Sequence, residues 1–462
     1  MSDVSDPHLN ISRIPGFYNL SQAERRSILA ERFGLNESDL KSFDCFGGLQ
    51  PETAEHMVEN TLGVLGLPVG VALNFVINGE PTLVPMAVEE PSVIAACSHI
   101  AGLVAETGGF SVETDPSVTV GQIQLVGVRD VEGTIAAILA QKEDLLKDGN
   151  ALCPGLVGRG GGCIDLEVRH LPQTQTGPHA DLDDGGSMVV VHIVIDCLDA
   201  MGANAVNTVV EGLAPRVETL SDGEARLRIL SNLADKRCAR ASMRIRFADL
   251  ARKAEPSKRE EQGLETAKRI VDAYRFAARD PYRACTHNKG IMNGVDAVAI
   301  ATGNDWRAIE AGAHAYAARS GQYTSLSRFW VDETDGCLHG EIELPMAVGT
   351  VGGATQVHPT IATCRKILGA FADRACTLAG VIAAVGLSQN CGALKALATE
   401  GIQRGHMTLH ARQVALAAGA TDDEVAQVAQ ALIKEQSIGP ANAKKILARI
   451  RPEGRPGEER CI

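Results

Sequence analysis

The stretch from Gly158 to Asn204 constrains the fold most strongly, because it combines a glycine run with a strand, a turn and a helix start. The β-branched strand Met188–Ile195 is followed at once by Asp199–Asn204, which contains glycine and alanine. A helix that starts in this way leaves backbone amides free to bind a phosphate. The glycine run Gly158–Gly162 precedes a strand rather than a helix, which excludes the standard G-x-G-x-x-G dinucleotide-binding unit. We therefore predict a β-α-β-β-α-β small domain over residues 117–235.

The segments on either side of this small domain predict a larger domain of mixed type. Ser21–Glu24 form a capping box for a helix that ends near Gly34. The strands Val69–Ile77 and Thr82–Met86 are joined by the tight turn Asn78-Gly79. Periodicity predicts helices at Val93–Leu103, Val131–Leu146, Lys258–Phe276, Trp306–Arg319 and Phe371–Gln389. The predicted fold class is α+β, with a small ferredoxin-like α/β domain inserted into the large domain.

The predicted division of the chain has four parts. The large domain takes residues 1–116 and 236–400, the small domain takes residues 117–235, and residues 401–462 form a mobile helical piece. The segment from Ser437 in this last piece is faintly similar to a helix-hairpin-helix DNA-binding module. The acidic charge balance favours a plain helical hairpin instead.

The composition bounds the classes of function. The 462 residues include 45% hydrophobic and 22% charged residues, as in a soluble globular protein with two or three domains. A formal net charge of -13 argues against general nucleic-acid binding and against binding to an anionic membrane surface. The sequence shows no signal-peptide core and no uninterrupted apolar window of about 18 residues. We therefore expect a cytoplasmic protein.

Cysteine and histidine spacing argues against a metal site. The 12 cysteines are scattered without a C-x-x-C pair, which favours reduced, buried thiols over a disulfide framework. His406 and His410 share a helix face and such a pair can bind zinc. However, Met407 stands where a metalloprotease has glutamate, and no third ligand is evident. We predict no bound metal.

Thr286–Gly294 is the first candidate for chemistry. It places Lys289 among small and amide-bearing residues, ahead of the apolar run Val295–Ala301. A lysine held still in a partly dry site stabilises an oxyanion far more strongly than a lysine in water. The alternative is a solvated loop lysine, and the local residues leave both interpretations open.

Polar residues at two predicted helix starts also have two interpretations. Glu90 and Ser92 flank Pro91, where acids commonly complement the helix dipole. A glutamate in an apolar setting instead keeps its proton and acts as a general acid. Asp305 precedes the helix Trp306–Arg319, so it is either the N-cap of that helix or part of a site.

Seven segments together resemble one family, the 3-hydroxy-3-methylglutaryl-coenzyme A reductases of the soluble bacterial type (class II). They occur in family order and are Glu59–Gly63, Val84–Ser92, Asp199–Asn204, Arg283–Gly294, Gly303–Asp305, Gly349–Gly353 and Gly401–Met407. Each motif is weak alone, whereas seven in order over most of the chain are specific. The resemblance implies an NAD(P)-dependent oxidoreductase that interconverts 3-hydroxy-3-methylglutaryl-CoA with mevalonate and coenzyme A through two hydride transfers.

The resemblance implies a role for each catalytic residue. Lys289 matches the lysine that stabilises the carbonyl oxygen, on which charge develops twice. Glu90 matches the glutamate that supplies a proton as the aldehyde becomes an alcohol, which requires a raised pKa. Asp305 matches the aspartate that orients these two groups. His406 matches the histidine on a C-terminal flap that protonates the departing coenzyme A thiolate.

Binding residues follow from the same resemblance. Arg283 matches the arginine that clamps the substrate carboxylate, with Ser92 and Asn390 as hydrogen-bonding neighbours. The residues expected to hold the nicotinamide cofactor are Asp199, Met201, Gly202, Asn204 and Asn232. In this family the active site lies at a dimer interface lined by Glu59–Gly63. We therefore expect a homodimer, or a larger oligomer built from dimers.

One departure from the family pattern concerns the cofactor. In Asn150–Pro154, Cys153 stands where NAD-using relatives present an acidic residue to the adenosine ribose, and no cluster of arginine or lysine replaces it. We expect NAD, with NADP as the alternative. The polar loop Thr174–Gly185 is also longer than the family pattern predicts.

Two other functions stay open at this point. One is a nicotinamide-dependent reductase that acts on a different acyl-CoA. The other is a non-enzyme that binds nucleic acid through its C-terminal helical hairpin. For the reductase, the sequence does not determine whether the physiological reaction forms mevalonate or consumes it.

Overall fold

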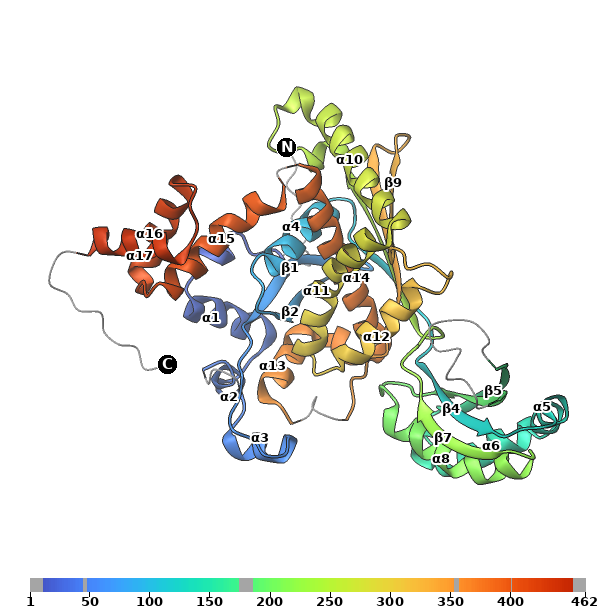
Figure 1. Ribbon diagram of the computed structural model, residues 1–462. Helices are drawn as coiled ribbons and strands as arrows, with labels where there is room; N and C mark the ends of the chain where they lie inside the picture. The colour runs from blue at the N-terminus through green and yellow to red at the C-terminus, as the bar shows by residue number, and fades with distance from the viewer. Residues whose placement is uncertain (1–10, 45–47, 174–185, 353–356, 400, 452–462) are drawn as a thin grey trace.

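The computed structural model describes residues 11–44, 48–173, 186–352, 357–399 and 401–451 (Figure 1). The helices are α1 (Gln22–Phe33), α2 (Glu37–Lys41), α3 (Pro51–Met57), α4 (Val93–Ala105), α5 (Val131–Ala140), α6 (Lys142–Leu152), α7 (Pro154–Val157), α8 (Ala203–Thr219), α9 (Phe247–Leu250), α10 (Arg259–Arg279), α11 (Pro281–Ala301), α12 (Trp306–Ala317), α13 (Pro359–Leu368), α14 (Ala375–Ala398), α15 (Ile402–Ala417), α16 (Asp422–Lys434) and α17 (Pro440–Ile450). The strands are β1 (Val69–Ile77), β2 (Glu80–Ala87), β3 (Ser111–Thr114), β4 (Val118–Val126), β5 (Gly162–Leu171), β6 (Met188–Asp196), β7 (Glu224–Leu230), β8 (Cys238–Arg246), β9 (Ser327–Asp332) and β10 (Cys337–Pro345).

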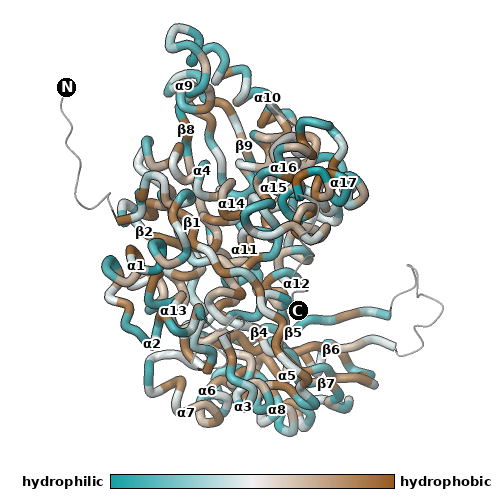
Figure 2. Tube along the Cα trace, turned by 90° about the vertical axis from the view of Figure 1, so that its left-hand side faces the viewer, coloured by the Kyte–Doolittle hydropathy of each residue, from teal (hydrophilic) through white to brown (hydrophobic). Residues whose placement is uncertain are grey.

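Helix α14 forms the centre of the large domain. It packs against α4, α10, α11 and the antiparallel sheet β3-β8-β10-β9, and Figure 2 shows hydrophobic segments gathered around it. It is the one helix among the described residues that is long and apolar enough to cross a membrane, but 83% of its apolar window is buried inside the protein. It is therefore a core helix. Small residues let its neighbours approach closely, since a Cβ on Gly294 of α11 would lie 3.0 Å from the Gln389 side chain.

The predicted hairpin leads directly to the candidate site. β1 and β2 pair antiparallel, and both turn residues between them, Asn78 and Gly79, have positive φ angles of 50° and 86°. This is the geometry that twists a two-residue hairpin correctly. The sequence places Pro91 in the first turn of the helix that begins near Val93, and this prediction is wrong, because Pro91 lies in a turn ahead of α4. Ser92, with φ 77°, occupies the N-cap position.

The structure removes the possibility that Lys289 lies in a loop. The whole stretch Thr286–Gly294 is in the middle of the 21-residue helix α11. The helix begins with Pro281, and the Asp280 side chain caps it by accepting a hydrogen bond from the Arg283 backbone N–H at 2.8 Å. Packing of α11 against α14 outweighs the low helix propensity of its two glycines.

The inserted segment folds around a core of its own. β4, β5, β6 and β7 form an antiparallel sheet in the order β5-β6-β4-β7, and α5, α6 and α8 pack against it. The predicted single helix Val131–Leu146 is two helices, α5 and α6, which meet at Gln141. In Figure 1 this unit lies at the lower right, beside rather than within the large domain.

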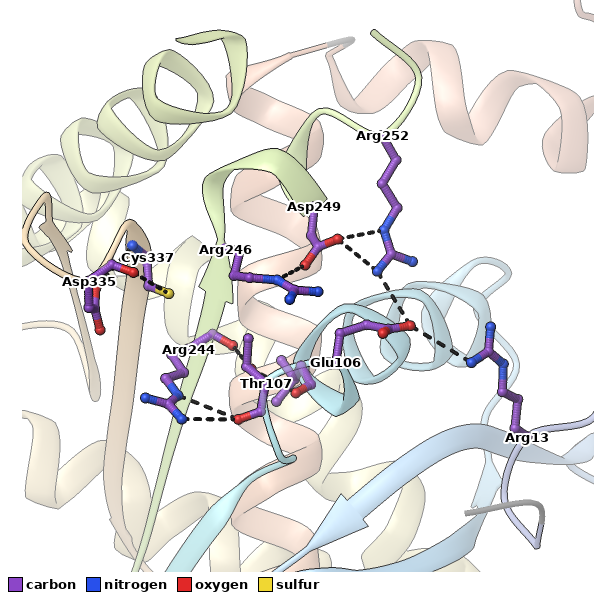
Figure 3. A network of polar contacts seen from close by, with 10 residues as sticks. Arg13, Glu106, Thr107, Arg244, Arg246, Asp249, Arg252, Asp335 and Cys337 are labelled. Carbon is purple, nitrogen blue, oxygen red and sulfur yellow. Dashed lines mark hydrogen bonds and ion pairs between the residues drawn. The ribbon is translucent and has the colours of Figure 1, made fainter. Parts of the chain in front are cut away.

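Charged side chains connect the outer end of α4 to the β8–α9 corner (Figure 3). The Asp249 carboxylate accepts hydrogen bonds from the guanidinium groups of Arg246 and Arg252 at 2.7 and 2.9 Å. Arg252 also lies 3.5 Å from Glu106, which is in turn 3.8 Å from Arg13. A network in which several charges share partners orders the corner better than an isolated surface pair does.

The C-terminal helices α15, α16 and α17 also have a hydrophobic core of their own. Its buried members include Ala411, Val414, Val428, Leu432 and Ile446. The sequence Thr421–Glu424 predicts a capping box for α16, and it is present, since the Glu424 side chain accepts from the Thr421 backbone N–H at 2.8 Å. Figure 1 shows these helices on the opposite side of the large domain from the small-domain sheet.

Candidate active site

The structure brings Lys289 and Glu90 together. The Lys289 Nζ donates a hydrogen bond to the Glu90 Oε2 at 2.9 Å, although the two residues are 199 positions apart. Asn293, one helical turn after Lys289, donates to the same oxygen from its Nδ2 at 3.2 Å. Sequence reasoning missed Asn293, although the four-residue spacing on a helix was the available signal. The pair forms because the β1–β2 hairpin ends over the exposed face of α11.

The surroundings of this pair differ from the expected dry site. The side chain of Lys289 is 63% exposed in the single chain, and that of Glu90 is 35% exposed. An ion pair that solvent screens to this degree contributes about 0–1 kcal/mol to stability. The pair therefore contributes little to the stability of the fold, and the single chain leaves it open to water.

Asp305 occupies the helix-capping position rather than the centre of this pair. Its Oδ1 accepts from the Ala308 backbone N–H at 3.1 Å, and the Arg307 guanidinium lies 3.4 Å away. In the part of the chain that the structure describes, Asp305 makes no hydrogen bond with Lys289 or Glu90. The neighbouring Asn304 links this turn to the glycine-rich segment by accepting from the Gly349 N–H at 2.7 Å.

Of the predicted substrate-binding residues, Arg283 and Ser92 are half-buried. Burial lowers the pKa of Arg283, and among the described residues its guanidinium has no hydrogen-bond partner. Asn390 is different, because only 1% of it is exposed and its Oδ1 accepts from the Ser327 hydroxyl at 2.7 Å. Arg283 is thus available to an anionic ligand, while Asn390 is already anchored to β9.

The predicted cofactor turn is attached to the large domain. The Asp199 Oδ1 accepts from the Ala375 N–H at 2.9 Å at the start of α14. The Asp199 backbone carbonyl accepts from the Thr350 N–H at 2.8 Å. The buried guanidinium of Arg237 donates to the carbonyls of Ala200 and Met201 at 3.2 and 3.4 Å. Asp199 and Met201 therefore connect the turn before α8 to the segments around Arg237, Thr350 and Ala375.

A pocket of about 320 Å³ adjoins this turn in the small domain. Of the five predicted cofactor residues only Gly202 lines it, whereas Asn204 and Asn232 are exposed. The rest of the lining comes from Leu152, Cys153, Pro154, Gly155, Leu156, Arg159, Cys197, Ala200, Ala205 and Thr208. The sequence signal for these lining residues was the segment around Cys153, which lacks the acidic residue of NAD-using relatives.

The chemistry of this pocket suits a cofactor with a phosphate. Gly202 precedes α8 with φ 104° and makes no side-chain cap, so the first amides of α8 are free to donate. Arg159 is the one charged residue of the lining. Burial raises the pKa of Cys153, so its thiol is neutral and does not reproduce the missing carboxylate.

His406 lies in α15, but its side chain is outside the described residues, as is Gly353 of the glycine-rich segment. The zinc alternative at His406 and His410 therefore stays untested. Among the described residues, Asp332, Asp335 and His339 hold possible ligand atoms within 4.8 Å of one another. Local hydrogen bonds account for this grouping, since Asp335 accepts from His339 at 2.8 Å and Asp332 accepts from the Thr334 N–H at 2.9 Å.

Comparison with known proteins defines the class. Residues 21–411 match the hydroxymethylglutaryl-coenzyme A reductase family. A 3-hydroxy-3-methylglutaryl-coenzyme A reductase from Archaeoglobus fulgidus is 47% identical over 440 residues, 95% of each chain. A probable reductase of the same name from Borreliella burgdorferi is 32% identical and covers 88% of this chain and 89% of its own length.

Solved structures agree with these relatives. The 3-hydroxy-3-methylglutaryl-coenzyme A reductase from Streptococcus pneumoniae superposes with a TM-score of 0.77 at 39% identity, over 95% of this chain and 99% of that one. A class II structure from the same organism, bound to NADPH in open conformations, gives a TM-score of 0.76 at 39% identity over 83% of this chain and 99% of that one. The fold and the site thus define an oxidoreductase of mixed α and β structure.

The chain belongs to the hydroxymethylglutaryl-coenzyme A reductase family. The resemblance drawn from seven sequence segments is confirmed, and so is the expected enzymatic function. The alternative of a non-enzymatic nucleic-acid-binding protein is set aside by a match that covers most of the chain.

Proposed function

We propose that Lys289, Glu90, Asp305 and His406 carry out the interconversion of 3-hydroxy-3-methylglutaryl-CoA with mevalonate and coenzyme A. The observation that carries this proposal is the 2.9 Å contact between Lys289 and Glu90 on the open face of α11. When bound, the nicotinamide supplies the two hydrides. Lys289 stabilises the oxyanion that forms when the thioester carbonyl carbon accepts the first of them.

The remaining steps are proton transfers. As the carbon–sulfur bond breaks, His406 protonates the departing thiolate. Glu90 gives its proton to the oxygen of the aldehyde as the second hydride arrives, and Asn293 holds the same carboxylate in place. Asp305 orients Lys289 and Glu90 at this stage. For this role its carboxylate must move toward them from its capping position at α12. Arg283 binds the free carboxylate of the acyl group through its planar guanidinium.

The test is an assay in both directions with both cofactors. Purified enzyme should oxidise the reduced cofactor with 3-hydroxy-3-methylglutaryl-CoA, and should reduce NAD or NADP with mevalonate and coenzyme A. Activity with another acyl-CoA alone would favour the alternative substrate. For His406, the Gln variant should lose thioester reduction more than reduction of free mevaldehyde. Equal loss on both substrates would remove the histidine from the thiolate step.

We propose that residues 117–235 form a ferredoxin-like cofactor domain and that residues 401–462 form a flap. The strand order β5-β6-β4-β7 supports the first assignment, and the separate core of α15–α17 supports the second. The pocket at Gly202 then takes the adenosine end of the cofactor. We expect both NAD and NADP to bind, because Arg159 favours a 2′-phosphate while no lining residue repels a ribose hydroxyl.

We propose a homodimer with the active site at its interface. The segment before β1 is open and apolar, with Leu62 104% and Leu65 92% exposed. Large apolar side chains exposed in this segment, together with an ion pair that is open to solvent, fit a second subunit that excludes water from both. Leu65→Asp should convert the dimer to a monomer, as measured by light scattering, and should reduce activity. Leu227→Asp, an exposed position on the small domain, is the matched control.

We also propose that the enzyme works in the cytoplasm. Ten cysteines are free in the described residues, and eight of them are buried. Reduced thiols in this number fit a reducing compartment.

A further inference from the structure

A buried polar cluster lies directly behind α11 and joins three elements. The His287 Nε2 is 2.8 Å from both the Ser325 and the Ser327 hydroxyls. Ser327 donates in turn to the Asn390 Oδ1 of α14 at 2.7 Å. His287 is only 2% exposed, and it lies one turn after Arg283 on the same helix. Its Nδ1 is buried without a partner among the described residues.

The donors and acceptors of this cluster determine its proton order. Each serine hydroxyl has one proton to give. That of Ser327 goes to Asn390, and that of Ser325 goes to the Ser327 carbonyl at 2.8 Å. A hydrogen on the His287 Nδ1 would be a buried donor without a partner among the described residues, so the ring hydrogen lies on Nε2 and both hydroxyl oxygens accept from it. Burial, with the charge of Arg283 as a second cause, lowers the pKa of His287 to about 3, so the ring stays neutral.

The directions of these hydrogen bonds also determine which atom of Asn390 is free to bind a ligand. With Oδ1 occupied by Ser327, the amide Nδ2 is the group left to bind a ligand. Three side chains in the described residues bury an unpaired polar atom, namely His287, Asp296 and His358. The Asn390 Nδ2 has no partner in that part of the chain and is not among these atoms. The small exposed remainder of Asn390 therefore includes its amide nitrogen.

We infer that His287 and Ser327 are positioning residues that hold Asn390 with its N–H donor, rather than its carbonyl, facing an oxygen of the acyl group. This inference rests on the proposed function, since Asn390 is taken there as a substrate neighbour. A reversed amide would present an acceptor to the substrate oxygens and would lose the hydrogen bond. The cluster opposes reversal, because a turned amide would donate to the Ser327 hydroxyl, which would then donate to the His287 Nε2 and leave the ring proton on Nδ1, where no acceptor lies among the described residues.

A double-mutant cycle tests this inference in the full-length enzyme. Ser327→Ala should raise KM for 3-hydroxy-3-methylglutaryl-CoA by about tenfold and leave KM for the nicotinamide unchanged. In the Asn390→Ala background the same change should have no further effect, because its target is gone. Ser327→Thr should restore the wild-type KM. Ser325→Ala, which removes a hydroxyl that does not reach Asn390, is the matched control.

Two further measurements separate positioning from simple structural support. Asn390→Asp should raise the acyl-CoA KM more than Asn390→Ala, since a carboxylate repels substrate oxygens. NMR of enzyme labelled at histidine nitrogen should show that the His287 ring, assigned by the loss of its signals in His287→Gln, is neutral and carries its proton on Nε2. Equal effects of Ser327→Ala in both backgrounds, or a proton on Nδ1, would overturn the inference. If Asn390→Ala leaves KM unchanged, the substrate role of Asn390 in the proposed function fails as well.

Discussion

The site on α11 and the pocket beside Gly202 are built in opposite ways. The first gathers charged and amide groups from segments up to 203 residues apart, as between Glu90 and Asn293. The second is lined by residues 152–208, largely with apolar side chains and backbone. A reacting centre needs charges at defined distances, which only tertiary packing supplies, whereas a phosphate-bearing cofactor is held by the free amides of one helix start.

The largest effect that distinguishes the two regions is expected from Lys289→Ala. Removing the oxyanion donor should lower kcat by about 10²–10³ or more without changing the melting temperature. The matched control is Lys268→Ala, which breaks another exposed lysine–glutamate pair, between Lys268 of the neighbouring helix α10 and Glu333 of the turn after β9. Steady-state kinetics of both variants decide the matter. Substantial activity of Lys289→Ala would remove this lysine from the chemistry.

Gly202→Ala should disturb the pocket both by straining the backbone and by a steric clash of the added methyl group. A Cβ at this position would lie 2.4 Å from the Cys197 Sγ, in a residue with φ 104°. We expect a loss of about 1–3 kcal/mol in unfolding free energy and a raised KM for the cofactor. Gly160→Ala has a similar φ, 96°, with nothing within 4 Å, so it isolates the backbone strain. Equal effects of the two variants would show that the pocket wall tolerates the added carbon.

Arg159→Ser should change the preference for the cofactor without changing the chemistry. Loss of the only charged residue of the lining should raise KM for NADPH by about tenfold and leave KM for NADH nearly unchanged. Arg129→Ser is the control, because Arg129 pairs with Asp222 outside this lining. An unchanged ratio of the two cofactors would place the 2′-phosphate elsewhere.

The smallest effect is expected from Asp296→Asn on the inner part of α11. Burial, followed by the charge of the neighbouring Glu310, raises the pKa of Asp296 above its ordinary value of 3.8. Above about pH 4 the folded protein therefore binds more protons than the unfolded protein. The free energy of unfolding consequently falls as the pH rises from about 4. The Asn variant should lack this decline. Urea unfolding at several pH values measures it, and Asp272→Asn, an exposed residue paired with Arg275, is the control.

Local patterns predicted the elements whose signals lie within a few residues. The Asn78-Gly79 hairpin and the Ser21–Glu24 capping box are present where expected, because turn and cap preferences arise from neighbouring atoms. The Lys289 stretch could not be placed by the same reasoning. Its glycines lower helix propensity, and only packing of Gly294 against α14 explains why the helix continues.

Motif matching selected candidate residues, and the structure gives two of them contacts that the motifs did not predict. Asp199 was expected to hold the cofactor, and in the structure its carboxylate accepts from the Ala375 N–H at the start of α14. Asn390 was expected beside the substrate, and it is anchored by Ser327. Neither contact could be inferred from the sequence, because each partner lies more than 60 residues away and belongs to no recognised motif.

The sequence by itself determined the family, the order of the elements and the identity of the candidate catalytic residues. These follow from residue types and spacings that the chain carries locally. The tertiary structure decided that Glu90 meets Lys289, that Asn293 shares the same carboxylate oxygen and that His287 of α11 contacts the Ser327 hydroxyl of β9. Such contacts depend on distances between groups far apart in the chain, and the packing of α11 between the hairpin and α14 sets those distances.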